Sequence, residues 1–394
     1  MSIGHEHFVG GALCPDKNPT RQQGACRGIK PLPHILHPPS SIRPPSFRCW
    51  LLPARGQSPG LRRGWSAFTL LELLIAVTIT LIIAGLMLTI TTNALELWRR
   101  QQAAQAQAAS ARQILDLLER DLQTAIHRRD GNRWLAADIL DSGGALANHG
   151  WLIGPGLMKP DNGGSLLPLP PADASGGRRI EDARFGLSGV WLRFVATNVE
   201  SGGSLPTVVA YQVARRPVIG DVTPGNPAPV RYSLYRSAVS NAETLANGYD
   251  VTASAYGSTS NTPTSALSTA YRQSRNVTNP SHANLLASNV VDFGCWLYGR
   301  GAAGELVRIY PSAAGDLSHQ AIGQSAANDT RFPEVADVMV RILSEEGASL
   351  IEAMERGRVV RPAEYPTDAA WWWGVVEKHS AVFVRRIEIK GSAP

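Results

Sequence analysis

One apolar stretch near the start of the chain constrains its fold more than any other feature. Residues 66–90 read SAFTLLELLIAVTITLIIAGLMLTI and carry a single carboxylate, Glu72, inside the apolar run. A helix needs about 20 apolar residues to cross the hydrocarbon core of a bilayer. An unpaired charge in that core costs at least a few kcal/mol, so a plain anchor has no use for this acid. The sequence therefore predicts a membrane-spanning helix in which a partner neutralises Glu72.

The nine residues around Glu72, at positions 68–76, read FTLLELLIA. They resemble the N-terminal cleavage and methylation motif of type IV prepilins and type II secretion pseudopilins. The resemblance implies that a prepilin peptidase cuts between Ala67 and Phe68 on the cytoplasmic side. It also implies N-methylation of the new terminus, Phe68, and places Glu72 at mature position five. The family usually has Gly before the cut, where this chain has Ala67.

The resemblance gives Glu72 a role in assembly. The ammonium group of Phe68 in one subunit and the carboxylate of Glu72 in its neighbour can neutralise each other in a helix bundle. Such a pair is much stronger in low-dielectric surroundings than in water, and removing one partner strands the other. A signal peptide is a poorer interpretation because its apolar region spans only about 7–15 residues. An ordinary single-pass anchor remains the alternative.

The charge of the chain divides at the predicted cut. Residues 1–67 hold nine Lys or Arg and two acids, which leaves 29 basic and 30 acidic residues in the remaining 327. The alkaline pI therefore belongs to the leader, and the mature chain has no basic excess that would predict nucleic-acid binding. Arg62 and Arg63 precede the span and favour a cytoplasmic leader. The rest is then expected in the periplasm, on an inner-membrane anchor.

The leader also holds three of the four cysteines. It is rich in Pro, Arg and Gly without apolar periodicity, so we expect residues 1–67 to be disordered before removal. Processing would leave Cys295 alone, and the mature chain would have no internal disulfide. Cys295 lies in an alternating apolar run at 291–297, which predicts that its thiol faces the core.

A long helix is predicted from residue 68 to residue 129, since no Pro and only Gly85 interrupts it. Residues 68–92 are expected to be its transmembrane half, and residues 93–129 its amphipathic half. In the second half, apolar residues recur at steps of three and four and form one face for packing on a sheet: Leu115, Leu118, Leu122 and Ile126.

Residues 130–394 are predicted to form a β-rich head. The stretch 131–186 is rich in Gly and Pro and is expected to be loops, and 252–283 is expected to be a Ser/Thr/Asn-rich surface loop. Between them and beyond, period-two alternation indicates antiparallel strands with one buried face. These strands are expected near residues 190–196, 209–213, 230–234, 291–297, 306–309, 336–342 and 383–389. The predicted fold class is α+β and pilin-like.

Two finer resemblances concern the head and the chain ends. Tyr235-Arg236, Leu285-Leu286 leading into 290–298, and the run 333–340 resemble the order of elements in J-type minor pseudopilins. The junction Ser66-Ala67-Phe68 and the closing run 385–391 are similar to those of prepilin-like cassette proteins of the Verrucomicrobia.

No catalytic motif is found along the chain. Residues 299–304 match G-x-G-x-x-G, but a strand-like run follows where a dinucleotide fingerprint needs a helix, so we expect a hairpin there. Glu345 and Glu346 are expected on the surface beside a turn at Gly347. The histidines and several acids share no ligand spacing: His127, His149, His282, His319, His379, Asp316, Asp329 and Asp337. The sequence predicts no enzyme, cofactor or metal site.

Three adjacent tryptophans, Trp371, Trp372 and Trp373, are the remaining unusual feature. Neighbours on a strand alternate faces, so at least one indole should be exposed unless a loop or partner covers it. Two interpretations stay open. The indoles form either a hydrophobic plug over the sheet or a docking patch for another pilin subunit.

Taken together, the sequence predicts a structural subunit that prepilin peptidase processes. It would enter or prime a type IV pilus or a type II secretion pseudopilus, with other pilin-like subunits as partners. A mature chain of 327 residues is large for a major pilin, whose bulk must stack at close intervals, so a minor subunit fits better. The alternative is a bitopic inner-membrane protein with a β-rich binding domain that does not polymerise.

Overall fold

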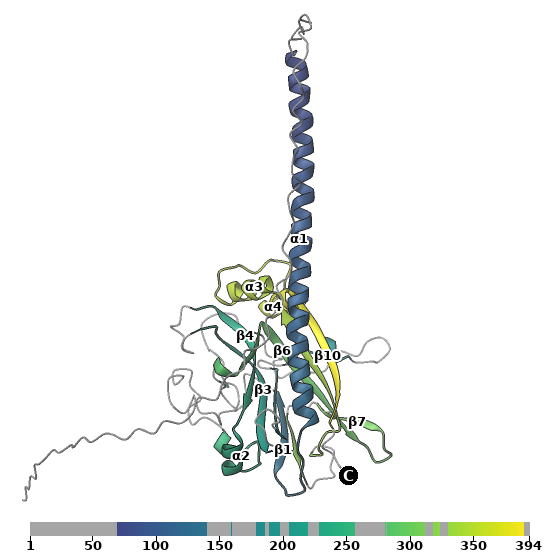
Figure 1. Ribbon diagram of the computed structural model, residues 1–394, viewed down its shortest axis with the longest axis vertical. Coiled ribbons are helices and arrows are strands. Elements are labelled where there is room, and N and C mark those ends of the chain that lie inside the picture. Colours follow the sequence, from purple (N-terminus) through teal and green to yellow (C-terminus); the bar gives the residue numbers. More distant parts are fainter. Residues whose placement is uncertain are drawn as a thin grey trace, which may run out of the picture. The chain divides into compact units, whose positions relative to one another are not determined.

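A computed structural model describes residues 69–139, 159, 179–185, 189–197, 205–219, 228–256, 280, 282–311, 318–323 and 330–389. The chain divides into two units, Met1–Thr69 and Leu70–Pro394. The predicted leader, 1–67, lies outside the described residues, as do Ala67 and Phe68. All elements below belong to the second unit (Figure 1).

The predicted long helix is present as α1, Leu70–Gln123, which is continuous over 54 residues. At 1.5 Å per residue it is about 80 Å long. It ends six residues before the predicted boundary at 129, because the following backbone joins a sheet. The Ile126 N–H donates to the carbonyl of Val195 at 2.8 Å, and the Thr197 N–H donates to that of Thr124 at 3.0 Å.

Two antiparallel sheets form the body of the head (Figure 1). The first has the order β5-β4-β3-β2-β1-β8, with β1 at Arg133–Ile139, β2 at Val190–Thr197, β3 at Pro206–Pro217, β4 at Val230–Ala238, β5 at Leu285–Ser288 and β8 at Ser318–Ile322. The second has the order β10-β9-β6-β7, with β6 at Val290–Arg300, β7 at Leu306–Tyr310, β9 at Val335–Leu343 and β10 at Ser380–Glu388. The α+β class is therefore confirmed, and each of the seven predicted strands is present.

The prediction of loops throughout 131–186 is wrong at its start. β1 pairs with β2 on one side and with β8 on the other, so it is an interior strand. Its sequence, RWLAADI, is buried at every position after Arg133. A strand buried on both faces does not alternate, which is why periodicity did not reveal it.

The prediction that each strand has a single buried face is also wrong at the centre of the first sheet. There β2 and β3 are buried along nearly their whole length. On one face of β3, Tyr211 bonds to α1 and its ring lies against Phe293 of β6. Arg216 differs from Tyr211 by an odd number of residues and so points to the opposite face. There its guanidinium donates to the carbonyl of Pro280. The central strands are thus covered on both sides.

Three short helices were not predicted: α2 (Asn241–Asn247), α3 (Glu345–Glu355) and α4 (Asp368–His379). Each has an N-cap side chain, Ser240, Ser344 or Thr367, whose oxygen accepts a backbone N–H three residues on. The turn expected at Gly347 is therefore the first turn of α3, although Glu345 and Glu346 are exposed as predicted. Single-turn helices occur at Ile180–Asp182, Ser254–Tyr256 and His282–Asn284.

The surface loop expected at 252–283 is described only at its two ends. Residues 257–279 and 281 lie outside the described residues. At the start of the range, Tyr256 is buried, and its hydroxyl donates to the carbonyl of Gly248. Pro280 is buried at the other end. Ser254 and Ala283 are exposed at the same two ends, so buried and exposed residues are mixed there.

Candidate functional site

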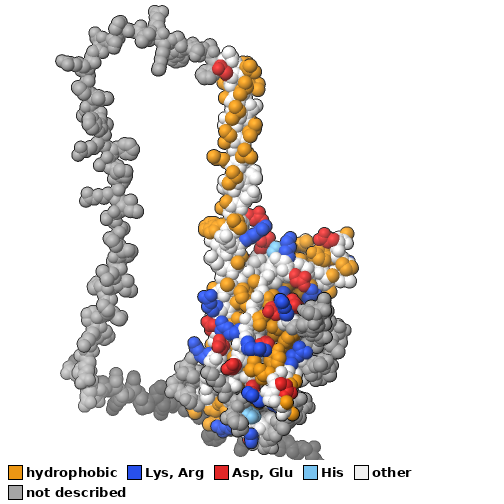
Figure 2. Space-filling model, turned by 90° about the vertical axis from the view of Figure 1, so that its right-hand side faces the viewer, with side chains coloured by type: hydrophobic (Ala, Val, Ile, Leu, Met, Phe, Trp, Pro, Cys, Tyr) orange, Lys and Arg blue, Asp and Glu red, His pale blue; other side chains and the backbone are white. Residues whose placement is uncertain are grey.

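The first half of α1 is the most exposed apolar surface among the described residues. Every residue from Thr69 to Gln102 is exposed. Figure 2 shows hydrophobic side chains all along the visible side of this half. Of the described helices, α1 is the one long and apolar enough to cross a membrane, and none of its apolar window is buried. The predicted membrane-spanning helix is therefore consistent with the structure.

The threonines of this half are compatible with an apolar environment. Thr78 donates its hydroxyl to the carbonyl of Ile75 at 2.8 Å, and Thr80 does so to Ala76 at 2.7 Å. Thr89, Thr91 and Thr92 make the same local bonds within the helix. A polar group in lipid must find an internal partner, and these hydroxyls have one. Glu72 is thus the exceptional polar residue in the span.

Glu72 lies in the first turn of α1 and is exposed. The N-terminus of a helix carries a partial positive charge, which stabilises a carboxylate there. The two predicted processing residues, Ala67 and Phe68, lie outside the described residues.

The second half of α1 packs on the head with the predicted stripe. Ile114, Leu118 and Leu122 are fully buried, and Leu115 is nearly so. The helix contacts β10, β9, β2 and β5. Ile126, the last member of the predicted stripe, lies beyond the end of the helix and is partly buried. The stripe therefore fastens the helix to both sheets.

A buried carboxylate, Asp121, holds the same part of α1 to the first sheet. It accepts a hydrogen bond from the Tyr211 hydroxyl of β3 and two from the guanidinium of Arg236 of β4, at 2.7 and 3.0 Å. Burial, with the Asp121 charge beside it, raises the pKa of Tyr211 well above its usual value. This bidentate pairing fixes the helix orientation as well as its position. Sequence periodicity gave no signal for it, because its three members come from distant segments.

Two other contacts fix α1 at the level where it leaves the head. The side-chain amide of Gln107 donates to the carbonyl of Ile342 at 2.9 Å and lies 3.5 Å from that of His379. Further along, Arg385 of β10 reaches Asp116 at 2.6 Å and Glu119 at 2.8 Å. Gln107 is the first buried residue of α1, so the exposed and buried halves meet here.

The tryptophan cluster lies on a helix. The exposure expected from the sequence assumed the alternating faces of a strand. Trp371, Trp372 and Trp373 lie in α4, and all three are buried. Trp372 packs edge-on against Tyr232 of β4, and its indole N–H donates to Glu355 at 3.2 Å. The strand assignment is therefore wrong. All three indoles are covered within the chain, which agrees with the interpretation of a hydrophobic plug over the sheet.

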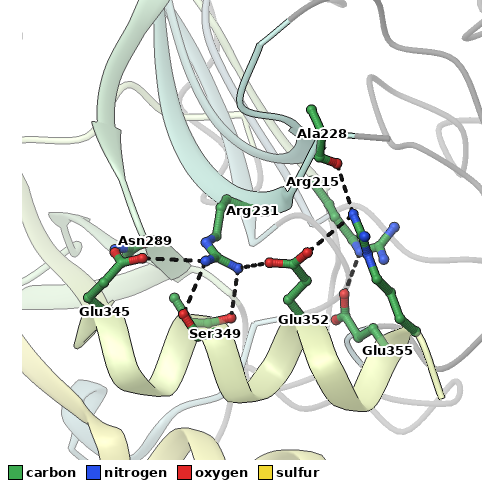
Figure 3. A network of polar contacts seen from close by, with 10 residues as sticks. Arg215, Ala228, Arg231, Asn289, Glu345, Ser349, Glu352 and Glu355 are labelled. Atoms are coloured by element: carbon green, nitrogen blue, oxygen red, sulfur yellow. Dashed lines mark hydrogen bonds and ion pairs between the residues drawn. The ribbon is translucent and has the colours of Figure 1, made fainter. Parts of the chain in front are cut away.

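Helix α3 is tied to the first sheet by a network of charges (Figure 3). Arg231 of β4 binds Glu352 and the Ser349 hydroxyl, and lies 3.4 Å from Glu345. Arg215 of β3 donates to Glu355 at 2.7 Å. Burial raises the pKa of Glu355, although Arg215 opposes that shift. The network holds α3 against β3 and β4 through three arginine–carboxylate contacts.

A second buried pair, Lys159 and Asp292, was also missed. The Lys159 ammonium lies 3.0 Å from the Asp292 carboxylate, and both side chains are fully buried. The ammonium also donates to the carbonyl of Val291 at 3.0 Å. Burial lowers the pKa of Lys159, and Asp292 opposes that shift. We interpret the pair as structural, because neither side chain reaches the surface.

The remaining predictions concern chemistry. Residues 299–304 form the hairpin between β6 and β7, where the Gly301 N–H donates to Glu305 and Gly304 has a φ of +86°. Cys295 is buried in the core as predicted. His149, Asp316 and Asp329 lie outside the described residues. Within the described part of the chain, no three His, Cys, Asp or Glu side chains come together to hold a metal.

Comparisons with known proteins add no assignment. No family model, curated protein or solved structure matches the chain. The functional proposal therefore rests on the residues of α1 and their geometry.

Proposed function

We propose that the chain is a minor pilin-like or pseudopilin-like structural subunit, processed by prepilin peptidase and assembled into, or priming, a type IV pilus or type II secretion pseudopilus. In this proposal the peptidase cuts between Ala67 and Phe68, and Phe68 becomes the methylated N-terminus. The leader is cytoplasmic, α1 crosses the inner membrane, and the head lies in the periplasm. The partners are the peptidase and other pilin-like subunits.

One observation carries the proposal: a single unbroken helix is apolar and exposed in its first half and bound to a sheet in its second. Leaving the membrane would expose the first half to water, so this half needs a bundle of similar helices around it. The second half transmits the position of that bundle to the head. A helix with one half for contact with other helices and one half bound to its own head suits a subunit whose helix forms the core of an assembly.

Glu72 supplies the register of the assembly in this proposal. The carboxylate pairs with the Phe68 ammonium of a neighbouring subunit within the apolar bundle. Each partner alone is costly in lipid, and together they are stabilised by the low dielectric. A shifted neighbour leaves both charges unpaired, so the pair selects one axial position. The head then determines where in the assembly the subunit fits.

Mass spectrometry of the mature N-terminus tests the processing step. Protein purified from its native host, with its prepilin peptidase intact, is expected to begin at N-methyl-Phe68. Deleting the peptidase should restore residues before Phe68. An intact leader, or a terminus elsewhere, contradicts the proposal and favours the bitopic protein that does not polymerise.

The Glu72→Leu variant tests the assembly step. We expect at least a tenfold loss of incorporation into sheared filaments or of crosslinking to neighbouring subunits, with membrane insertion unchanged. Glu96→Leu is the matched control, because Glu96 is an exposed acid on the same helix that pairs with Arg100. Incorporation that is equal in both variants contradicts a role for Glu72 and leaves an ordinary anchor.

A further inference from the structure

The connection between α3 and α4, residues 356–367, is an exposed segment with an unusual tip. Val360 is 88% exposed and Val359 is 38% exposed. Two exposed arginines flank them, Arg358 and Arg361. Two adjacent exposed valines between cations make this tip amphipathic, which suits contact with a surface that is itself amphipathic.

The connection lies at the end of the head from which the exposed half of α1 emerges. Gln107, the first buried residue of α1, contacts Ile342 just before α3 and His379 at the end of α4. Figure 1 shows the connection beyond α3, on the side toward the exposed half of the helix. A bilayer crossed by that half would therefore face the connection.

The sequence of α1 places the bilayer surface close to this end. Exposed apolar side chains continue as far as Leu97 and Trp98, and Arg99 and Arg100 follow. Tryptophan and arginine in this order are typical of the boundary between the membrane and water. Gln107 lies nine positions after Trp98, which is about 14 Å of helix. The lipid headgroup layer covers about half of that rise, which brings the membrane surface close to this end of the head.

We propose that the α3–α4 connection docks on the anionic lipid surface around α1. Val359 and Val360 insert among the headgroups, and Arg358 and Arg361 bind lipid phosphates. Arg361 is paired at 2.8 Å with Asp368, whose side chain is largely exposed, so the guanidinium can exchange this partner for a phosphate. The contact would fix the tilt of the head on its membrane anchor before any assembly.

This proposal rests on the membrane-spanning part of the proposed function but not on processing or polymerisation. Its failure is therefore distinguishable from theirs. If the mature chain begins at Phe68 but the connection does not contact lipid, only the lipid contact is contradicted. If the connection contacts lipid but the chain is not processed, only the pilin pathway is contradicted.

Fluorophore quenching on the full chain in vesicles tests the contact. A Val360→Cys variant, with Cys14, Cys26 and Cys49 changed to Ser, is labelled with an environment-sensitive fluorophore, and Cys295 is buried. Alkaline extraction first confirms insertion. The matched control is Leu245→Cys, since Leu245 is 72% exposed on α2 at the opposite end of the head (Figure 1).

Headgroup-spin-labelled lipid is expected to quench position 360 at least twofold more than position 245 in vesicles with 30% phosphatidylglycerol. Changing Arg358 and Arg361 together to Gln should remove most of this difference, and so should vesicles of phosphatidylcholine alone. Equal quenching at the two positions overturns the proposal and leaves a protein partner for the valines. Quenching that is unchanged in neutral vesicles overturns the role of anionic lipid.

Discussion

The two halves of α1 are parts of one helix but obey different rules. From Leu70 to about Trp98, apolar side chains cover the helix all round and none is buried. From Gln107 to Leu122, apolar side chains occupy one stripe and are buried by the sheets. A helix that is apolar on all sides needs an apolar environment, whereas a helix with one stripe needs a single partner. The first half therefore requires a membrane or a bundle, and the second already has its partner.

The polar residues of the two halves show the same contrast. In the first half, threonines bond to their own helix, which satisfies them without fixing any neighbour. In the second half, Gln107 and Asp121 bond to strands far away in the sequence, so each specifies one docked position. The polar groups of the membrane half therefore leave its surface available for helices of other subunits. Those of the docked half fix that half to its own head.

The largest expected difference between the halves is in the free energy of unfolding after a Leu→Ala substitution in each. Leu118→Ala removes a fully buried side chain and should destabilise the head by about 2–5 kcal/mol. Leu81→Ala is the matched control on the exposed half and should leave the head within ~0.5 kcal/mol of the parent. Urea unfolding followed by tryptophan fluorescence in detergent measures both. Equal losses would mean that the exposed half also supports the folded head.

A smaller effect is expected from the charge that orients the docked half. Asp121→Asn leaves Arg236 without its carboxylate partner and should destabilise the head by about 2 kcal/mol, less than a fully buried pair because water still reaches Arg236. Asp116→Asn is the control, since Asp116 pairs with Arg385 on the surface and should matter by less than ~1 kcal/mol. The same urea transitions compare the two. A loss at Asp116 as large as at Asp121 would show that exposure does not weaken these pairs.

Local periodicity predicted the second half of α1 and seven of the strands. The stripe at Leu115 and Leu118 led to the correct helix and its buried side. The alternation around Cys295 led to the correct strand, β6, although both faces of that strand are buried. Periodicity failed for β1, whose residues are buried on both faces, and for α4, whose three tryptophans were assigned to a strand. In both cases apolar residues form an unbroken run, Trp134–Ala137 in β1 and Trp371–Trp373 in α4, which obscures the repeat that distinguishes a helix from a strand.

Residues that act through distant partners could not be predicted. Asp121 meets Tyr211 and Arg236, and Lys159 meets Asp292, across separations that no spacing rule covers. Glu72 differs, because an acid in an apolar run is anomalous by composition alone. The exposed acid at the start of a long helix was therefore predictable, whereas the interactions that hold the docked half were not.

The smallest expected effect concerns the end of the docked half. His127 follows α1, and its ring stacks on Phe332 with centroids 4.7 Å apart. Burial lowers the pKa of His127 below 6.5, as does the nearby charge of Arg129, whereas Asp130 opposes the shift. Since the folded state binds this proton less readily than the unfolded state, His127 should destabilise the head as the pH falls below about 6.5. His127→Phe keeps a ring on Phe332 but cannot titrate. Between pH 7.5 and pH 5.5 its urea midpoint should therefore fall slightly less than that of the parent, and an identical fall would show that the junction between helix and sheet is insensitive to this charge.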